Sequence, residues 1–257
     1  MNTIFVYSGT GNTIASAKQL ATALTAKTEK IRAELTGEFA GEVGILMYPV
    51  FAYGMPMEVK RFIKRATFKF DYFAVITTCG SYSKGAFAEA IRLLKRRKQK
   101  VHYSDEIRSV ENFVHMFKLP PQDAIAQIIS TQKQRTAQIA QNIADKKTNR
   151  RFLLRPMSSF ILWVFRRATP MFARRYKFTP ACTNCGICVK VCPSGAVRPV
   201  TKPESEHATP TVDAKRCDFC QGCLQSCPHR AIRFGKIQPE SRRYKHPDVS
   251  IDELFKR

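Results

Sequence analysis

The sequence predicts an α/β protein in which a doubly wound parallel sheet is followed by a second, smaller α+β domain. Three observations support this fold class. Strands and helices alternate through the first 145 residues, a glycine-rich turn joins the first strand to the first helix, and two cysteine-rich runs follow residue 178. With 257 residues the chain is long for one compact domain and suits two.

The expected strands of the first domain are short apolar runs, and the helices between them have one apolar face. The first strand, residues 4–7, precedes a helix whose apolar stripe is formed by Ile14, Ala17, Leu20 and Leu24. A second strand near residues 30–34 has only a weak pattern. Later strands are expected at 43–51, 72–79 and 101–104, and later helices at 55–65, 87–94 and 125–143. Buried strands that alternate with amphipathic helices predict a parallel sheet covered on both faces.

Residues 146–177 differ in composition from the segments on either side. They contain ten Lys or Arg residues and no Asp or Glu. An apolar run, FILWVF at 160–165, lies between Pro156 and Pro170 and predicts a short amphipathic helix that is much too short to span a bilayer. We therefore expect one domain over 1–145, a basic linker over 146–177, a cysteine-rich domain over 178–238 and a tail over 239–257. The tail is polar and charged, so we expect it to be partly disordered or to lie on the protein surface.

The cysteine-rich domain contains one motif twice. The first copy has the spacing C-x2-C-x2-C-x3-C-P, and the second repeats it 35 residues later; the cysteines are Cys182, Cys185, Cys188 and Cys192, then Cys217, Cys220, Cys223 and Cys227. Thiolates are soft ligands that bind iron–sulfur clusters or zinc. Structural zinc usually takes two C-x2-C pairs, so the third cysteine at the same spacing favours a cubane cluster over a double zinc site or a disulfide knot.

Residues 178–235 resemble the bacterial ferredoxins that carry two [4Fe–4S] clusters, in which the fourth cysteine of each run binds the other cluster. The resemblance implies one cluster on Cys182, Cys185, Cys188 and Cys227, and a second on Cys217, Cys220, Cys223 and Cys192. We expect Gly186 and Gly222 to occupy equivalent positions in the two runs, where glycine lets the backbone approach a cluster closely.

The glycine-rich turn SGTGNT, residues 8–13, opens the first helix, where free amides and the helix dipole bind anions. It is neither a Walker motif nor a dinucleotide-binding G-x-G-x-x-G turn. Its hydroxyl and amide side chains are suited to hold a phosphate monoester without a lysine. Two more glycine-containing loops, residues 48–56 and 77–85, follow the third and fourth strands and carry aromatic residues. A flat cofactor needs such flat apolar partners, and Phe51, Tyr53 and Tyr82 are the candidates for stacking.

These three loops make the first 145 residues similar to flavodoxins, which have the sheet order 2-1-3-4-5 and bind FMN at the switch point between strands 1 and 3. The resemblance implies that the FMN phosphate is bound by Ser8, Thr10, Gly11, Asn12 and Thr13. It also implies that the ring lies between two loops, the first formed by Pro49, Val50, Phe51, Ala52, Tyr53 and Gly54, and the second by Thr78, Cys79, Gly80, Ser81 and Tyr82. For Cys79, the ninth cysteine, a redox role and a role as a small buried filler both remain open. The whole chain resembles the fused flavodoxin–ferredoxin proteins of anaerobic prokaryotes.

The formal net charge of +23 indicates a surface that attracts acidic proteins, nucleic acid or anionic lipid. Nucleic acid is not favoured, because no recognised binding module accompanies the charge. The expected partner is an acidic redox protein. The basic linker has three interpretations: it packs between the domains, it presents a docking face to this partner, or it contacts a membrane surface through residues 150–177.

The N-terminus has neither the basic nor the long apolar region of a secretory signal. Together with thiols that must stay reduced, this predicts a cytoplasmic protein. Two clusters and FMN on one chain predict an electron carrier that couples one- and two-electron transfer at high effective concentration. The alternative is a flavin-dependent reductase of a small molecule such as a quinone or an enone, fed by the clusters, with Tyr53, Tyr82 or Cys79 as the proton donor.

Overall fold

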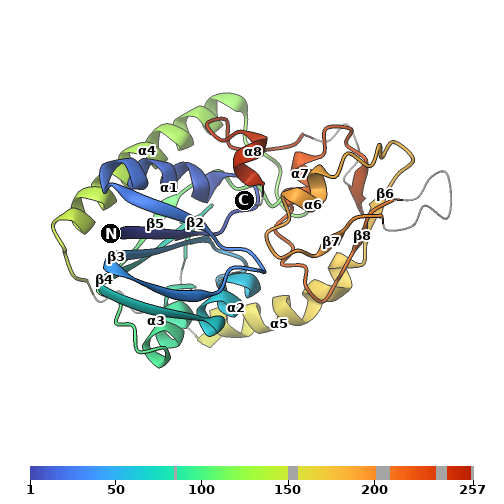
Figure 1. Cartoon of the computed structure of the whole chain (residues 1–257). Helices are drawn as coiled ribbons and strands as arrows, with labels where there is room; N and C mark the ends of the chain where they lie inside the picture. The colour runs from blue at the N-terminus through green and yellow to red at the C-terminus, as the bar shows by residue number, and fades with distance from the viewer. Residues whose placement is uncertain (84–85, 150–155, 201–208, 236–241, 256–257) are drawn as a thin grey trace.

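The computed structural model describes residues 1–83, 86–149, 156–200, 209–235 and 242–255, and for residues 156–159 only the backbone. The described chain forms a parallel sheet with helices on both faces and a smaller domain at one edge (Figure 1).

Five parallel strands form the sheet in the order β2-β1-β3-β4-β5. They are β1 (Asn2–Val6), β2 (Ala26–Lys30), β3 (Gly37–Pro49), β4 (Ala66–Cys79) and β5 (Tyr103–Arg108). This is the predicted flavodoxin-like order, so the predicted fold class is confirmed. Val6 is level with Lys30 of β2 and with Met47 of β3, so the carboxyl ends of the strands meet at one edge of the sheet.

Helices α1 (Asn12–Ala23) and α4 (Gln122–Ala144) cover one face of the sheet, and α2 (Met57–Arg65) and α3 (Ala86–Arg96) cover the other (Figure 1). Alternate residues of each strand supply the two cores, as the pleat requires. Ile4 and Val6 pack with α1 and α4, whereas Phe5 and Tyr7 pack with α2 and α3.

The predicted position of the second strand is wrong. A strand was predicted near residues 30–34, but β2 ends at Lys30. This strand, AKTEK, lies at the edge of the sheet and buries none of its residues fully, so it has no hydrophobic alternation to reveal it. Strands β3 and β4 are longer than predicted, with 13 and 14 residues.

The smaller domain has two antiparallel pairs: β6 (Tyr176–Phe178) with β9 (Ile232–Phe234), and β7 (Val197–Arg198) with β8 (Thr211–Val212). Two short helices, α6 (Ile187–Lys190) and α7 (Gly222–Ser226), contain the third cysteine of each run, Cys188 and Cys223. Positive φ angles recur at the 35-residue spacing of the repeat, in the pairs Asn184/Phe219, Gly186/Gln221 and Gly195/Arg230.

The expectation that Gly186 and Gly222 are equivalent is therefore wrong. Gly186, with φ 73°, corresponds to Gln221, with φ 62°. Gly222 is instead needed for close packing, because a Cβ there would lie 2.9 Å from the carbonyl oxygen of Gly9.

Two further segments connect the domains. Helix α5 (Pro156–Ala173) has 18 residues and continues through Pro170, so it is longer than the short helix predicted. It runs beneath α2 towards β6 (Figure 1). The tail, residues 242–255, ends in α8 (Ile251–Leu254), whose Leu254 joins the same core as α1. Within the described residues, no helix has both the length and the apolarity needed to cross a membrane.

Candidate functional site

Three cysteines of the first run and one of the second surround a small cavity. Cys182, Cys185, Cys188 and Cys227 all line it. Burial, and then the nearby thiolates of Cys182, Cys227 and Cys185, raise the pKa of Cys188 to about 12. The fold thus brings Cys227 to the other run.

The remaining four cysteines form the reciprocal group. Burial, followed by the thiolates of Cys192, Cys217 and Cys220, raises the pKa of Cys223 well above its usual range. Burial and Cys192 also raise the pKa of Cys220 to about 12. Cys192 of the first run thus acts electrostatically on Cys217, Cys220 and Cys223, in the sense that crossed ligation implies, while ligation of iron by these residues stays a prediction.

Backbone amides donate to several of the cysteine sulfurs. The amide of Ala196 donates to Cys192 Sγ at 3.2 Å, and that of Ala231 donates to Cys227 Sγ at 3.3 Å, with the same four-residue offset. In the second run the amide of Phe219 donates to Cys217 Sγ at 3.4 Å. Such bonds stabilise thiolate sulfur and tune the potential of a bound cluster.

The chemistry of these sulfurs fits an iron–sulfur cluster. All nine cysteines are described, and none of them forms a disulfide. Thiolates crowded in apolar surroundings are costly unless a cationic centre neutralises them. In the described ranges, no group of three or more His, Cys, Asp or Glu side chains converges as the ligands of a single metal ion do. The ligands of a cubane are held apart by the cluster's own iron and sulfide.

The phosphate turn, residues 8–13, follows β1 and opens α1. Gly11 has φ 100°, and its amide donates to Ser8 Oγ at 3.1 Å. The amides of the first helical turn have no acceptor inside the helix and face the end of the sheet at which a flavodoxin binds phosphate. The turn also keeps hydroxyl donors, because Ser8 Oγ accepts a bond and retains its own proton. These groups fit a phosphate monoester.

One predicted phosphate ligand has a different role. The Asn12 side chain is used within the protein, since its Nδ2 donates to the carbonyl oxygen of Val110 at 2.9 Å and its Oδ1 accepts from Tyr244 at 2.7 Å. The Thr13 and Thr78 hydroxyls lie 2.8 Å apart and join the phosphate turn to the end of β4.

Three other segments enclose the phosphate turn. A Cβ on Gly9 would lie 2.7 Å from the carbonyl oxygen of Cys220, and one on Gly11 would lie 3.0 Å from Cβ of His246. Asn112, in the loop between β5 and α4, donates to Thr10 Oγ1. Ser8, Thr10 and Thr13 are consequently at most 7% exposed. Proximity to the second cysteine run and to the tail was not visible in the sequence, because both lie more than 200 residues away.

The first predicted flavin loop, residues 49–54, is a tight turn. Phe51 and Gly54 exchange two backbone hydrogen bonds of 2.9 Å. Ala52 and Tyr53 between them have φ angles of 46° and 64°, the left-handed geometry of a type I′ turn. Neither residue is glycine, so the turn holds strain of the kind that clusters at ligand sites. Gly54 lies directly against Leu162 of α5.

The second predicted flavin loop, residues 78–82, ends with an exposed aromatic ring. Tyr82 is 53% exposed, and the Arg108 guanidinium lies 4.5 Å from its ring centroid. Gly80 packs against the Glu111 side chain, and Ser81 is exposed. Burial raises the pKa of Cys79 to about 12, so this residue is a neutral thiol, which favours the filler role over a redox role.

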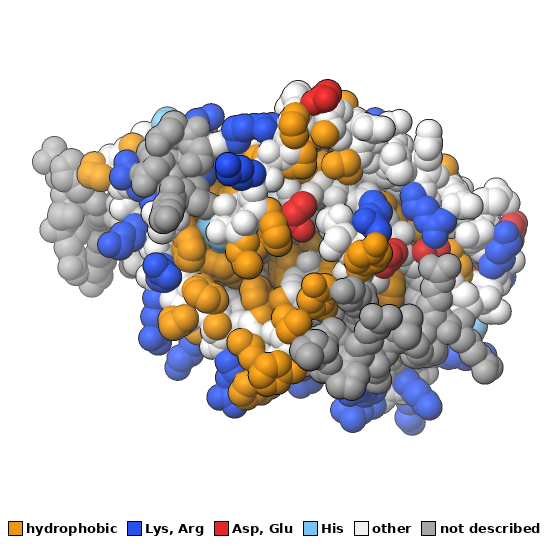
Figure 2. Space-filling view, turned by 180° about the vertical axis from the view of Figure 1, so that it is seen from behind, with side chains coloured by type: hydrophobic (Ala, Val, Ile, Leu, Met, Phe, Trp, Pro, Cys, Tyr) orange, Lys and Arg blue, Asp and Glu red, His pale blue; other side chains and the backbone are white. Residues whose placement is uncertain are grey.

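A hollow with apolar walls opens on the back face of the molecule (Figure 2). Phe51 and Tyr53 of the first predicted flavin loop are half-buried, and Tyr82 of the second is exposed. A planar aromatic cofactor suits such surroundings.

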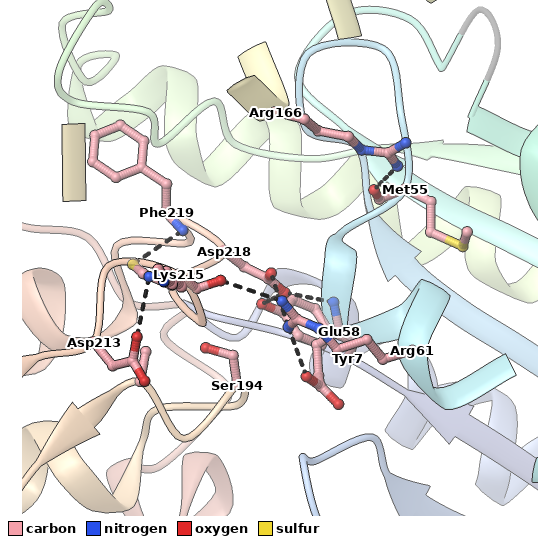
Figure 3. Close-up of polar contacts among 12 residues, drawn as sticks. Tyr7, Met55, Glu58, Arg61, Arg166, Ser194, Asp213, Lys215, Asp218 and Phe219 are labelled. Carbon is pink, nitrogen blue, oxygen red and sulfur yellow. Dashed lines mark hydrogen bonds and ion pairs between the residues drawn. The ribbon is translucent and has the colours of Figure 1, made fainter. Parts of the chain in front are cut away.

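Asp218, which sequence analysis did not single out, joins the domains. Its Oδ2 accepts from the Tyr7 hydroxyl and from the Glu58 amide, each at 2.9 Å (Figure 3). Asp218 as a whole residue is 4% exposed, and burial raises the pKa of its carboxyl to about 6. Arg61 lies 3.9 Å from the other carboxylate oxygen. No local pattern marks an aspartate inside a cysteine run as a residue that binds another domain.

Comparison with known proteins agrees with this geometry. Residues 181–232 match the family model of the 4Fe-4S dicluster domain. An iron-sulfur protein of Rhodospirillum rubrum is 38% identical over 66 residues, which cover 21% of this chain and 35% of that protein. The polyferredoxin protein MvhB of Methanothermus fervidus is 39% identical over 62 residues, 23% of this chain and 13% of that protein. The chain thus spans only about a third or less of these curated relatives.

Among solved structures, flavodoxin from Megasphaera elsdenii has a TM-score of 0.34 at 21% identity, covering 41% of this chain and 85% of that one. Rubredoxin oxygen:oxidoreductase from Desulfovibrio gigas has a TM-score of 0.33 at 13% identity, covering 56% of this chain and 36% of that one. The fold assignment itself depends on the strand order and the parallel pairing.

A 2-1-3-4-5 parallel sheet with a dicluster domain at its carboxyl edge defines an iron–sulfur protein built on a flavodoxin-like domain. The chain therefore combines a flavodoxin-like sheet with a segment that matches the 4Fe-4S dicluster domain, the two domain types that its motifs predicted.

Proposed function

We propose that this protein is an electron carrier that relays electrons between two [4Fe–4S] clusters and FMN. The clusters exchange single electrons, and FMN accepts or donates one or two. The chain's own contribution is to hold these groups close together and to exclude water from the space between them.

The contact between the second cysteine run and the phosphate turn is the observation that carries the proposal. Gly9 and Gly222 touch so closely that neither position has room for a methyl group. Cys220 joins the same core cluster as Phe51 of the first predicted flavin loop. A cluster bound to this run and a flavin bound to these loops would be neighbours in one chain, without a diffusional encounter.

The anchoring residues favour a fixed arrangement of the domains over a flexible tether. Asp218 is bonded to both Tyr7 and the start of α2, and Gln225 Nε2 donates to the carbonyl oxygen of Asn112 at 3.1 Å. From the flavodoxin-like domain, Arg32 donates to the carbonyl oxygen of Val191 at 3.3 Å. These buried bonds support transfer at a constant distance. We further place the protein in the cytoplasm, where its thiols stay reduced, and infer that its redox partner is acidic, given the net charge of +23.

The first test is the cofactor content of anaerobically purified protein. We expect about eight irons, about eight sulfides and one FMN per chain. A preparation that contains zinc and no iron would contradict the cluster assignment. Intact clusters with no FMN, even after incubation with excess FMN, would contradict the flavin assignment.

The second test separates a carrier from a reductase. The reduced protein is mixed with a protein carrier in one arm, and with a quinone or an enone in the other. A carrier exchanges electrons rapidly with the protein and turns over the small molecules slowly. Rapid steady-state turnover of a small molecule would support the reductase instead.

A further inference from the structure

Helix α5 has two faces of different character. The inward face packs on both domains: Leu162 lies against Gly54, and Phe165 and Phe172 join the aromatic core of the smaller domain. Arg166 on this face forms an ion pair with Glu89 at 2.6 Å and donates to the carbonyl oxygen of Met55 at 2.8 Å. The helix is therefore fixed in place, and its outward face keeps a constant orientation.

The outward face is apolar and uncovered within the described chain. Its members recur at the helical spacings of three and four residues, and their exposed fractions are 61% for Phe160, 56% for Trp163, 43% for Val164 and 57% for Met171. Ile161, 38% exposed, widens this stripe at its N-terminal end. The rings of Phe160 and Trp163 stack at 6.2 Å. Isolated exposed apolar residues are ordinary, but a continuous stripe marks an interaction site.

Basic side chains accompany the stripe. The Arg167 guanidinium lies 5.4 Å from the Trp163 ring centroid, and Arg174, Arg175 and Lys177 are exposed at the C-terminal end of the helix and just beyond it. Residues 146–177 contain no carboxylate at all. In Figure 2, apolar side chains gather in the lower part of the back face, and Lys and Arg lie along their outer edge.

We propose that the outward face of α5 docks on the surface of an anionic lipid bilayer, with the helix lying in the plane of the headgroups. The helix is about 27 Å long, which suits a helix that lies in the interface. Phe160, Trp163 and Val164 would enter the boundary of the acyl chains, and the arginines would bind phosphate groups. This inference does not depend on the electron-transfer function.

The composition of the stripe favours lipid over an acidic protein. An acidic carrier would pair with the arginines but leave large apolar side chains against a polar surface, since transient redox contacts are small and polar. Tryptophan beside arginine, with aliphatic and aromatic neighbours, is instead the pattern of interfacial helices.

The test uses the holoprotein and vesicles of phosphatidylcholine, alone or with about 30% phosphatidylglycerol. Trp163 is the only tryptophan of the chain, so its emission reports directly on this face. With anionic vesicles we expect co-flotation, a blue shift of the Trp163 emission and protection from acrylamide. With phosphatidylcholine alone we expect weak binding, and with anionic vesicles binding should weaken as salt rises.

Two double variants separate the apolar from the electrostatic contribution. Phe160→Ser with Val164→Ser should lower partitioning roughly tenfold or more, because exposed apolar area is lost without disturbing the core. Arg174→Gln with Arg175→Gln should lower it roughly tenfold on anionic vesicles. The matched control is Lys95→Gln with Arg96→Gln, which removes the same charge at the C-terminal end of α3, away from Glu89. It should change partitioning less than twofold.

Three results would overturn the proposal. One is the absence of flotation with anionic vesicles at low ionic strength. Another is equal binding by the Phe160/Val164 variant, which would indicate general attraction to the net positive charge. The third is failure to bind vesicles together with binding of a purified acidic electron carrier that the α5 variants weaken, which would assign the face to a protein partner.

Discussion

Two glycines lie at a tight backbone contact between the domains. A Cβ at residue 9 would lie 2.7 Å from the carbonyl oxygen of Cys220 and 3.3 Å from its Sγ. A Cβ at residue 222 would lie 2.9 Å from the carbonyl oxygen of Gly9. In both cases the obstacle is backbone, which cannot move aside as the end of a flexible side chain does.

Gly9→Ala is expected to push the second cysteine run away from the phosphate turn. Overpacking of this kind costs about 1–3 kcal/mol of stability, and the proposed transfer from clusters to flavin should become slower while iron and FMN contents stay unchanged. The measurement is the rate of flavin reduction after rapid reduction of the clusters. Gly222→Ala should reproduce the effect from the other side, whereas Ala23→Ser, an exposed change on α1, should not. An unchanged transfer rate in both glycine variants would show that this contact does not set the distance.

Tyr7→Phe tests the anchor at Asp218. The substitution removes the hydroxyl that donates a 2.9 Å hydrogen bond to Asp218, a residue that is only 4% exposed. The Glu58 amide remains as the other donor to that oxygen. Loss of one donor to a buried carboxylate lowers the free energy of unfolding by about 1–3 kcal/mol. We expect a corresponding fall in the midpoint of chemical unfolding under anaerobic conditions. Tyr82→Phe, at an exposed ring, is the control, and a Tyr7→Phe loss as small as that of the control would contradict the anchoring role.

At the scale of elements, the tail acts as a strap across the phosphate turn. The amide of His246 donates to the carbonyl oxygen of Thr10 at 2.9 Å, and Val249 joins the core shared with α1 and α4. A capping box between Ser250 and Glu253 starts α8. The tail therefore ties the start of α1 to the smaller domain, because the Tyr244 amide donates to Gln225 Oε1 at 2.8 Å.

His246 makes this strap sensitive to pH. Burial lowers its pKa to about 4; Asp248 opposes this shift, and Lys133, Lys245 and Lys18 add to it. In the unfolded chain the pKa of His246 is about 6.5, so between about pH 6.5 and pH 4 the unfolded chain binds the proton more readily than the folded protein does. The contribution of the neutral His246 ring to folding stability is therefore fully present above about pH 6.5. It is lost as pH falls towards 4, by an amount on the order of 2 kcal/mol.

The variant His246→Asn removes the titration and keeps an acceptor for the Asp248 amide, which donates to His246 Nδ1 at 3.2 Å. The variant should lose less stability than the wild type between pH 7 and pH 4.5, as measured by apparent melting temperature under anaerobic conditions. Acid lability of the clusters and protonation of His115, whose pKa burial also lowers to about 4, are common to both proteins and cancel in the difference. Parallel losses in the two proteins would contradict the assignment.

The elements with a strong hydrophobic period were predictable, and those without it were not. Strands β1, β3 and β4 are buried over their C-terminal parts, so apolar runs revealed them. Strand β2 is mostly polar, and the apolar residues of the tail, such as Val249 and Leu254, are scattered among polar ones and pack on a core formed by residues far away in the sequence. The resemblance to two-cluster ferredoxins implied that Cys227 lies with the first run, and Cys227 does line the cavity formed by Cys182, Cys185 and Cys188. The roles of Asp218 and Asn12 were not predictable, because each depends on a partner more than 90 residues away.

At the scale of the whole molecule, crossed ligation specifies which cysteines bind the same cluster, and the spacing of the cysteines alone cannot test this. Cys192 belongs to the first run in sequence, yet its sulfur lies with Cys217, Cys220 and Cys223. Cys227 belongs to the second run but lines the cavity of the first. Each cluster would therefore fasten the two halves of the domain to each other, which a module with so small a core needs for stability.

Single Cys→Ser variants reveal this connectivity when they are compared in pairs. Cys192→Ser and Cys217→Ser should damage the same cluster and each lose up to about four irons. The cluster that remains should give the same electron paramagnetic resonance spectrum in both variants. Cys227→Ser and Cys182→Ser should give the other residual spectrum. The proposed contact with the phosphate turn adds a second distinction, because only the first pair removes the cluster next to the flavin loops and should slow flavin reduction. If Cys192→Ser instead matched Cys182→Ser, each run would hold its own cluster, and the cysteines grouped in the fold would not be the ligands.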